Sequence, residues 1–240
     1  MFREDFEILK NDLIYFDNNA TSFKPKQVLK AIEDYYNKYT ANAHRGDYKN
    51  SLKVDMIYED TRNLIKNYIN ARQKEEIIFT SGATDSLNMI ASFFKEILKS
   101  GDEVLITKTE HASNVLPWLK LEKEIGIKVK YIPLDKDLKL SVENLENAIT
   151  DRTKLVSIAH VTNTIGDVRD IKRIGKLLDS KNIYFVVDAA QSAGHRKIDV
   201  VESNIDFLAF SGHKMLGPTG IGVLYGKLEI LKELSPVRVG

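Results

Sequence analysis

From residue 77 onward, short apolar runs rich in β-branched residues alternate with segments of helical periodicity. The apolar runs cover residues 77–79, 104–106, 129–132, 155–159, 183–187, 207–210 and 221–225. Short buried strands separated by helices are typical of a mostly parallel sheet with helices on both faces. The pattern predicts an α/β fold with three α/β/α layers for residues 76–240, without a domain boundary between about 75 and 226.

Residues 1–75 follow a different pattern. The apolar run 13–16 ends in a polar stretch, and helical spacing of apolar residues follows Pro25 and recurs from about Leu52 to Ile69. A polar, loop-like stretch at 41–46 separates the two helical patterns. We expect an N-terminal helical segment over 1–75 that packs on the large domain, with one polar loop that can reach a site.

Polar clusters follow five of the predicted strands. They are Gly82–Thr84, His111, Asn163, Asp188–Gln191 and Ser211–Lys214. In open α/β sheets the ligand lies at the carboxyl ends of the strands, where all five clusters would meet. The pattern therefore predicts one ligand site at this edge of the sheet.

Two of these clusters offer groups for covalent chemistry. Lys214 follows a buried strand, and an amine whose pKa is lowered by its surroundings becomes a nucleophile able to form a Schiff base. The alternative is a lysine on a solvated loop. Asp188 emerges from another buried strand, where a carboxylate needs a partner such as a protonated pyridine nitrogen. The alternative for Asp188 is a cap on the next helix.

The turn at 81–84 and His111 complete the set. A helix that begins after a strand presents backbone N–H groups to an anion, and Thr84 adds a hydroxyl, although an ordinary N-cap explains this residue equally well. His111 can stack on a flat ring or play a structural role.

No Walker loop and no G-x-G-x-x-G fingerprint is present in the sequence, and their absence disfavours a nucleotide-binding protein.

Composition narrows the class of protein. The net charge is +1, from 35 basic and 34 acidic side chains, so the chain has no electrostatic footprint for nucleic acid or an anionic membrane. No apolar run approaches a membrane span, and the charged start lacks a signal-peptide core, which together predict a cytoplasmic protein. The chain contains no cysteine, which excludes disulfides and thiolate metal sites within it, and no metal site is predicted.

Seven stretches resemble one enzyme family in the same order along the chain. They are FDNNAT (16–21), NAHRGDY (42–48), FTSGATDSLN (79–88), TEHASNVLPW (109–118), HVTNTIGDV (160–168), VDAAQSAGH (187–195) and FSGHKMLGPTGIGVLYG (210–226). The chain resembles the class V, fold-type-I enzymes that use pyridoxal 5'-phosphate (PLP), and among them the cysteine desulfurase and selenocysteine lyase group. The resemblance implies the large domain of a PLP-dependent transferase.

The resemblance also implies roles for single residues. Lys214 would form the Schiff base and move the α-proton, Asp188 would pair with the pyridine nitrogen, and Gln191 would bond the ring hydroxyl. His111 would stack on the ring and assist proton transfer. The implied phosphate contacts are Ala83, Thr84, Ser211 and His213, and the implied substrate contacts are Asn18, His44, Arg45 and Asn163, the last of which would also face the ring hydroxyl.

The implied reaction converts L-cysteine to L-alanine and passes sulfur to an enzyme cysteine, for sulfur mobilisation and iron–sulfur cluster assembly. Relatives are longer and carry that cysteine in a small C-terminal domain, so we expect a truncated chain that lacks this domain and cannot mobilise sulfur by itself. The alternatives are another class V enzyme (an aminotransferase, an epimerase or a selenocysteine lyase) or a non-catalytic remnant or interaction subunit. Implied partners are L-cysteine or a related amino acid, a second copy in a homodimer, and a sulfur-acceptor or scaffold protein.

Overall fold

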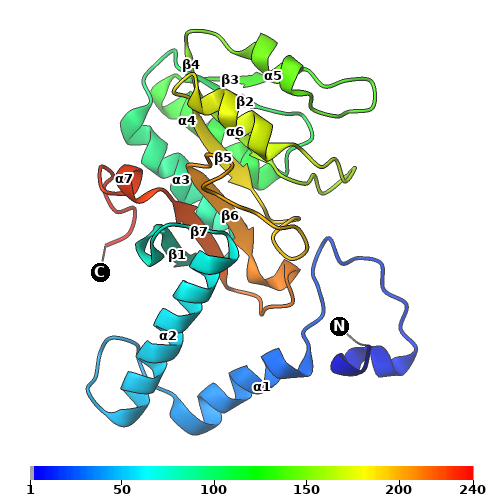
Figure 1. Ribbon diagram of the computed structural model, residues 1–240, viewed down its shortest axis with the longest axis vertical. Helices are drawn as coiled ribbons and strands as arrows, with labels where there is room; N and C mark the ends of the chain where they lie inside the picture. Colours follow the sequence, from blue (N-terminus) through cyan, green and yellow to red (C-terminus); the bar gives the residue numbers. More distant parts are fainter. Residues whose placement is uncertain (1–2, 240) are drawn as a thin grey trace.

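The computed structural model describes residues 3–239, which form a seven-stranded sheet between layers of helices, with a helical arm at one end (Figure 1). The strands are β1 (Ile77–Thr80), β2 (Glu103–Ile106), β3 (Lys128–Tyr131), β4 (Thr153–Ala159), β5 (Tyr184–Asp188), β6 (Phe207–Ser211) and β7 (Gly222–Gly226). Their spatial order is β1-β7-β6-β5-β4-β2-β3, and β7 is antiparallel to both of its neighbours while the other pairs are parallel. The predicted α/β fold with a mostly parallel sheet is confirmed.

The direction of β7 follows from its connection. Residues 212–221 join β6 to β7, and Ser211 lies opposite Gly222 in the register of the pair. A parallel crossover needs about a dozen residues or more and usually a helix, whereas this connection contains only the short helix η6 (Gly212–Lys214). The chain therefore turns back on itself, and the Lys214 turn stays at the edge of the sheet where the parallel strands end.

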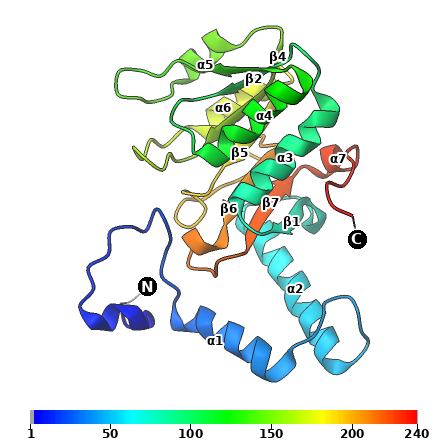
Figure 2. The ribbon, with the colours of Figure 1, turned by 180° about the vertical axis from the view of Figure 1, so that it is seen from behind.

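Helices cover both faces of the sheet (Figures 1 and 2). The helices are α1 (Lys26–Asp34), α2 (Lys49–Tyr68), α3 (Ala83–Ile97), α4 (Leu116–Ile125), α5 (Val142–Ala148), α6 (Ile171–Asp179) and α7 (Leu228–Leu231). Successive strand residues point to opposite faces: Val104 and Ile106 belong to the apolar core under α3 and α4, and Leu105 belongs to the core under α5 and α6. Two-sided burial explains why these strands appear in the sequence as continuous apolar runs.

Helices α1 and α2, joined through the π-helical turn Tyr35–Tyr39, form an arm that projects away from the sheet (Figures 1 and 2). Both helical patterns expected in this part of the sequence are present. Helix α1 has no buried residue and α2 buries only Ser51, so the arm contacts the sheet domain mainly where α2 ends, at Ile69, which is fully buried. The division of the chain at residue 75 remains a prediction.

A close backbone approach fixes the start of α3 against β7. A Cβ atom added to Gly222 would lie 2.4 Å from the Cα atom of Gly82, the residue that precedes α3. Glycine at 222 therefore lets β7 lie directly against the turn between β1 and α3. This contact brings the first turn of α3 next to the end of β6. Within residues 3–239, no helix has the length and apolar character needed to cross a membrane.

Candidate active site

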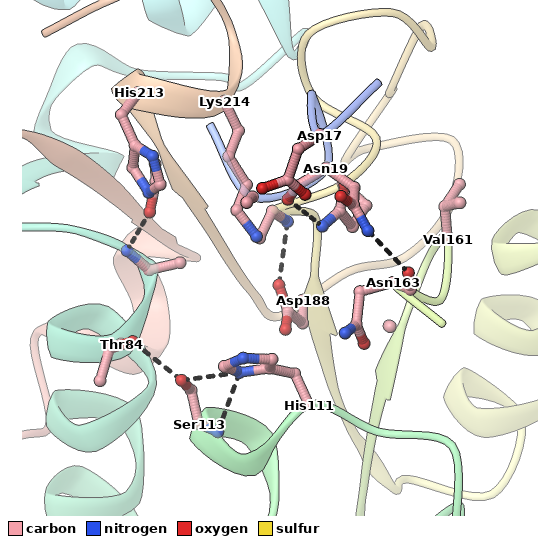
Figure 3. Close-up of a pocket in the computed structure, with 16 residues that line it drawn as sticks. Asp17, Asn19, Thr84, His111, Ser113, Val161, Asn163, Asp188, His213 and Lys214 are labelled. Carbon is pink, nitrogen blue, oxygen red and sulfur yellow. Dashed lines mark hydrogen bonds between the residues drawn. The ribbon is translucent and has the colours of Figure 1, made fainter. Parts of the chain in front are cut away.

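A cavity of about 440 Å³ lies at the carboxyl edge of the parallel strands (Figure 3). It is lined by all nine residues that the sequence predicts as cofactor contacts: Ala83, Thr84, His111, Asn163, Asp188, Gln191, Ser211, His213 and Lys214. These residues come from the ends of β1, β2, β4, β5 and β6 and from the turns that follow them. The structure therefore brings the five polar clusters together at one place.

Lys214 closes the short turn η6 directly after β6. Its side chain is half-buried and points into the cavity toward Asp188 (Figure 3). Burial lowers the pKa of the Lys214 amine, and the charge of Asp188 opposes this effect. The amine makes no hydrogen bond or ion pair with another group in residues 3–239. It is therefore available to a ligand as a nucleophile or a base.

Asp188 is the last residue of β5 and is buried. Its Oδ1 accepts one hydrogen bond, from the backbone N–H of Ala190 at 2.9 Å. Burial raises the pKa of Asp188 to about 6, and the bond from Ala190 acts in the opposite direction. A single hydrogen bond does not compensate a buried carboxylate for lost hydration, so this group is suited to a cationic or N–H partner inside the cavity.

The first turn of α3 forms an anion cradle. Gly82 precedes the helix and supplies no side-chain cap, so the positive helix end opens toward the cavity. The Ala83 N–H donates to Ser211 Oγ at 2.7 Å, which places a buried hydroxyl beside the same turn. Backbone N–H groups and hydroxyls at a helix N-terminus are suited to a phosphate.

His111 lies across the cavity from Lys214 and is held by Ser113. Its Nδ1 accepts the Ser113 N–H at 3.2 Å and lies 2.9 Å from Ser113 Oγ. Because Nδ1 is an acceptor, the neutral ring carries its proton on Nε2. Burial lowers the pKa of His111, and the charge of Lys214 adds to the effect. The structure thus presents a neutral imidazole to the cavity.

The N-terminal segment contributes a wall that the sequence analysis did not predict. Asn19 and Asp17 line the cavity together with Ser113. The Gln191 amide donates to the backbone oxygen of Asn19 at 2.8 Å, and the Asn19 amide donates to that of Asn163 at 3.3 Å (Figure 3). The polar run that follows residues 13–16 was the available signal for this wall.

Three of the predicted substrate residues lie outside the cavity. Asn18 lines a separate hollow formed mainly by apolar side chains of residues 6–23 and by Leu216. His44 and Arg45 are exposed in the loop of the projecting arm, where the His44 N–H donates to Asp55 at 2.6 Å. Only Asn163, among the four, lines the cavity. The positions of these four residues do not test their substrate-binding roles, which stay predictions.

Fold and site together define an α/β protein with a cofactor cavity built from an amine, a buried carboxylate, an imidazole and an anion cradle. A family model described as aminotransferase class-V matches residues 14–240, and the chain belongs to this family. A curated relative, a probable cysteine desulfurase from Halalkalibacterium halodurans, is 44% identical over 237 residues, which make up 98% of this chain and 58% of that protein.

Solved structures agree with this assignment. The apo structure of a cysteine desulfurase from Thermococcus onnurineus NA1 has a TM-score of 0.94 at 42% identity, and the match covers 99% of this chain and 59% of that chain. The structure of SspA in complex with cysteine has a TM-score of 0.85 at 33% identity, covering 95% of this chain and 65% of that chain. This chain thus spans less than two-thirds of the length of these relatives.

Members of the family use pyridoxal 5'-phosphate, and the residues of the cavity fit this cofactor. Asp188 is a buried carboxylate with one hydrogen bond, which a protonated ring nitrogen would complement. The α3 cradle suits the phosphate, and the Lys214 amine has no competing partner within residues 3–239. Among the same residues, no cluster of three or more potential metal-binding side chains is present.

Proposed function

We propose that this chain is the cofactor-binding part of a PLP-dependent cysteine desulfurase that acts on L-cysteine. The observation that carries the proposal is the convergence of the nine predicted cofactor residues on one cavity. The names of the relatives support the choice of substrate, since they are called cysteine desulfurases and one structure was solved with cysteine. These 240 residues contain no cysteine, so the thiol that would accept the sulfur is not among them.

Three residues of the cavity would have separate roles in cofactor binding and proton transfer. When bound, PLP supplies an electron sink that stabilises negative charge at the substrate Cα atom. Asp188 would hold the ring nitrogen protonated. The burial of Asp188 would strengthen the interaction between its carboxylate and the ring N–H. The Lys214 Nζ, with its pKa lowered by burial, would accept the proton from Cα, and the Nε2–H of His111 would donate to the substrate or leaving group.

The first experiment tests the cofactor site. The 240-residue chain is mixed with PLP, reduced with borohydride and digested, and the modified lysine is located by mass spectrometry. We expect the label on Lys214 and its loss in Lys214→Ala, while Lys108→Ala, which removes an exposed lysine outside the cavity, keeps the label. Labelling spread over many surface lysines would contradict the proposal.

A second experiment tests the substrate without requiring the sulfur acceptor. In D₂O, the PLP-loaded chain should exchange the Cα hydrogen of L-cysteine for deuterium, as followed by NMR, and Lys214→Ala should abolish the exchange. Accumulation of D-cysteine would instead indicate an epimerase, and conversion of the cofactor to its amine form would indicate an aminotransferase. Sulfide or alanine release by the chain alone would contradict the expected need for a separate thiol.

The proposal includes a homodimer formed through the projecting arm. The arm leaves Leu52, Met56 and Leu64 more than half exposed, and exposed apolar faces of this kind mark protein contacts. His44 and Arg45 on the same arm would then serve the cavity of the second copy. We expect Met56→Glu to produce monomers in analytical ultracentrifugation, with Ser92→Glu, at an exposed position of α3 outside the arm, as a control that leaves the dimer intact. The proposal also includes a sulfur-acceptor or scaffold protein as a partner. It further includes a cytoplasmic location, which cell fractionation would test.

A further inference from the structure

Three side chains link the anion cradle to the imidazole. The Ser113 hydroxyl lies 2.8 Å from Thr84 Oγ1 on α3 and 2.9 Å from His111 Nδ1 (Figure 3). The Ser113 N–H also donates to the same Nδ1, at 3.2 Å. Thr84 and His111 both line the cavity, and Ser113 directly connects the place where an anion would bind with the imidazole ring.

Counting protons fixes the direction of these bonds. Nδ1 accepts the backbone N–H, so it has no proton of its own to give. Each hydroxyl has a single proton. The Ser113 O–H therefore donates to Nδ1, and the Thr84 O–H donates to Ser113 Oγ. In this arrangement the only hydroxyl proton of Thr84 is engaged by Ser113 and is not available to a ligand.

A phosphate in the cradle would compete for that proton. A charged phosphate oxygen is a stronger acceptor than a neutral hydroxyl, so Thr84 would turn its O–H toward the anion. Its oxygen would then be free to accept, and the Ser113 O–H would turn from His111 to Thr84. Nδ1 would lose one of its two hydrogen bonds and become more basic.

We propose that Ser113 is a positioning residue that couples occupancy of the anion cradle by a phosphate group to the basicity of His111. The relay rests on the proposed function, because it requires the cradle at Thr84 to bind phosphate. Its consequence is that the imidazole takes up a proton more readily when the phosphate of a ligand is in place, and the resulting imidazolium is the form whose Nε2–H donates most strongly to the substrate. Proton transfer is thereby tied to correct docking of the ligand.

The charge of a phosphate also acts on His111 directly, as do the other groups that face the cavity. These groups are Lys214 from η6, Asp188 from β5, His213 beside Lys214 and Asp17 from the N-terminal segment; Glu110, which precedes His111, is buried against Arg169. Replacing Ser113 leaves all of them in place. The relay is therefore measured as the difference in response between the wild type and Ser113 variants.

The experiment follows the His111 ring by NMR as a function of pH, with and without saturating inorganic phosphate. The signal is assigned with His111→Gln, since the chain has five histidines. We expect phosphate to raise the pKa of His111 in the wild type by about half a unit more than in Ser113→Ala, the size expected for one neutral hydrogen bond. Ser92→Ala, which removes a hydroxyl on the outer face of α3, should respond like the wild type.

Ser113→Thr and Ser113→Val form an isosteric pair that separates the hydroxyl from packing. The threonine variant should restore the wild-type response and the valine variant should not. Phosphate binding is recorded in the same samples from the amide signals of Ala83 and Thr84. Binding with equal pKa shifts in all variants would overturn the relay and leave the cradle standing. No binding at the Thr84 amide would overturn both the cradle and the relay.

Discussion

The guanidinium of Arg169 and the carboxylate of Glu110 form an ion pair in which both side chains are 0% exposed. Glu110 also accepts the N–H of Ala159, at 2.7 Å, and Arg169 donates to the Ala159 oxygen, at 3.2 Å. Ala159 ends β4 and lines the cavity, and Glu110 directly precedes His111. The pair therefore joins the loop that carries the imidazole to the floor of the site.

Removing one partner of this ion pair should strongly destabilise the fold. Arg169→Met leaves the Glu110 carboxylate buried without its cation, a situation that costs about 3–5 kcal/mol. We expect urea unfolding to show a loss of this size. In contrast, Arg173→Met removes an exposed arginine on α6 and should change stability by less than about 0.5 kcal/mol.

The double variant Glu110→Leu, Arg169→Met gives the sharper test of the pair. The double variant leaves neither member of this pair uncompensated, whereas Asp167, which lies 3.6 Å from Arg169 Nε, loses its cation in the double variant just as it does in Arg169→Met. The double variant should therefore be more stable than Arg169→Met alone. Additive losses in this cycle would show that the two groups act independently.

Asp188 should make stability depend on pH in the absence of cofactor. Its pKa is raised to about 6 in the folded chain, from an unfolded value near 4, because burial disfavours the charged form. Folding therefore carries no penalty from Asp188 below pH 4 and its full penalty above pH 6, about 3 kcal/mol at 1.36 kcal/mol per unit.

Asp188→Asn isolates this contribution. The free energy of unfolding of the variant minus that of the wild type should increase as the pH rises from 4 to 7, as measured by urea unfolding at several pH values. A difference that stays constant over this range would mean that the carboxylate keeps an ordinary pKa.

Gly222 should tolerate no side chain. A methyl group there would lie 2.4 Å from the Gly82 backbone and would push β7 away from the first turn of α3. We expect Gly222→Ala to cost about 1–3 kcal/mol and to weaken phosphate binding at the cradle. Gly220→Ala, in the same connection, has open space around its Cβ but a φ of +78°, so it should cost about 1 kcal/mol and leave phosphate affinity unchanged.

Ser22 should hold the N-terminal wall in place. Its hydroxyl donates to the His213 oxygen at 2.9 Å and accepts the Leu216 N–H at 2.8 Å. In Ser22→Ala the Leu216 N–H loses its partner, a loss of about 1–3 kcal/mol. Hydrogen exchange at the Leu216 amide should accelerate accordingly, and unchanged protection there would show that the segment is held by other contacts.

Much of the fold could be predicted from local signals. Two-sided burial makes the strands continuous apolar runs, and strand ends are marked by polar residues, so Asp188 and Lys214 could be assigned to one edge of one sheet. Ser113 and Asn19 escaped prediction because a serine or an asparagine in a polar loop is ordinary. Their roles depend on partners such as Thr84 and Gln191, which are distant in the sequence.

By itself, the sequence determined the order of strands and helices, the class of fold and the five polar clusters at the strand ends that line the cavity, because periodicity and turn chemistry act over a few residues. The tertiary structure decided the reversed direction of β7, the docking of residues 17–22 beside Lys214, and the burial of Arg169 against Glu110. It also carried His44 and Arg45 away from the cavity on the arm. These features depend on which distant segments pack together, and that packing is a cooperative property of the whole core rather than of any local stretch of sequence.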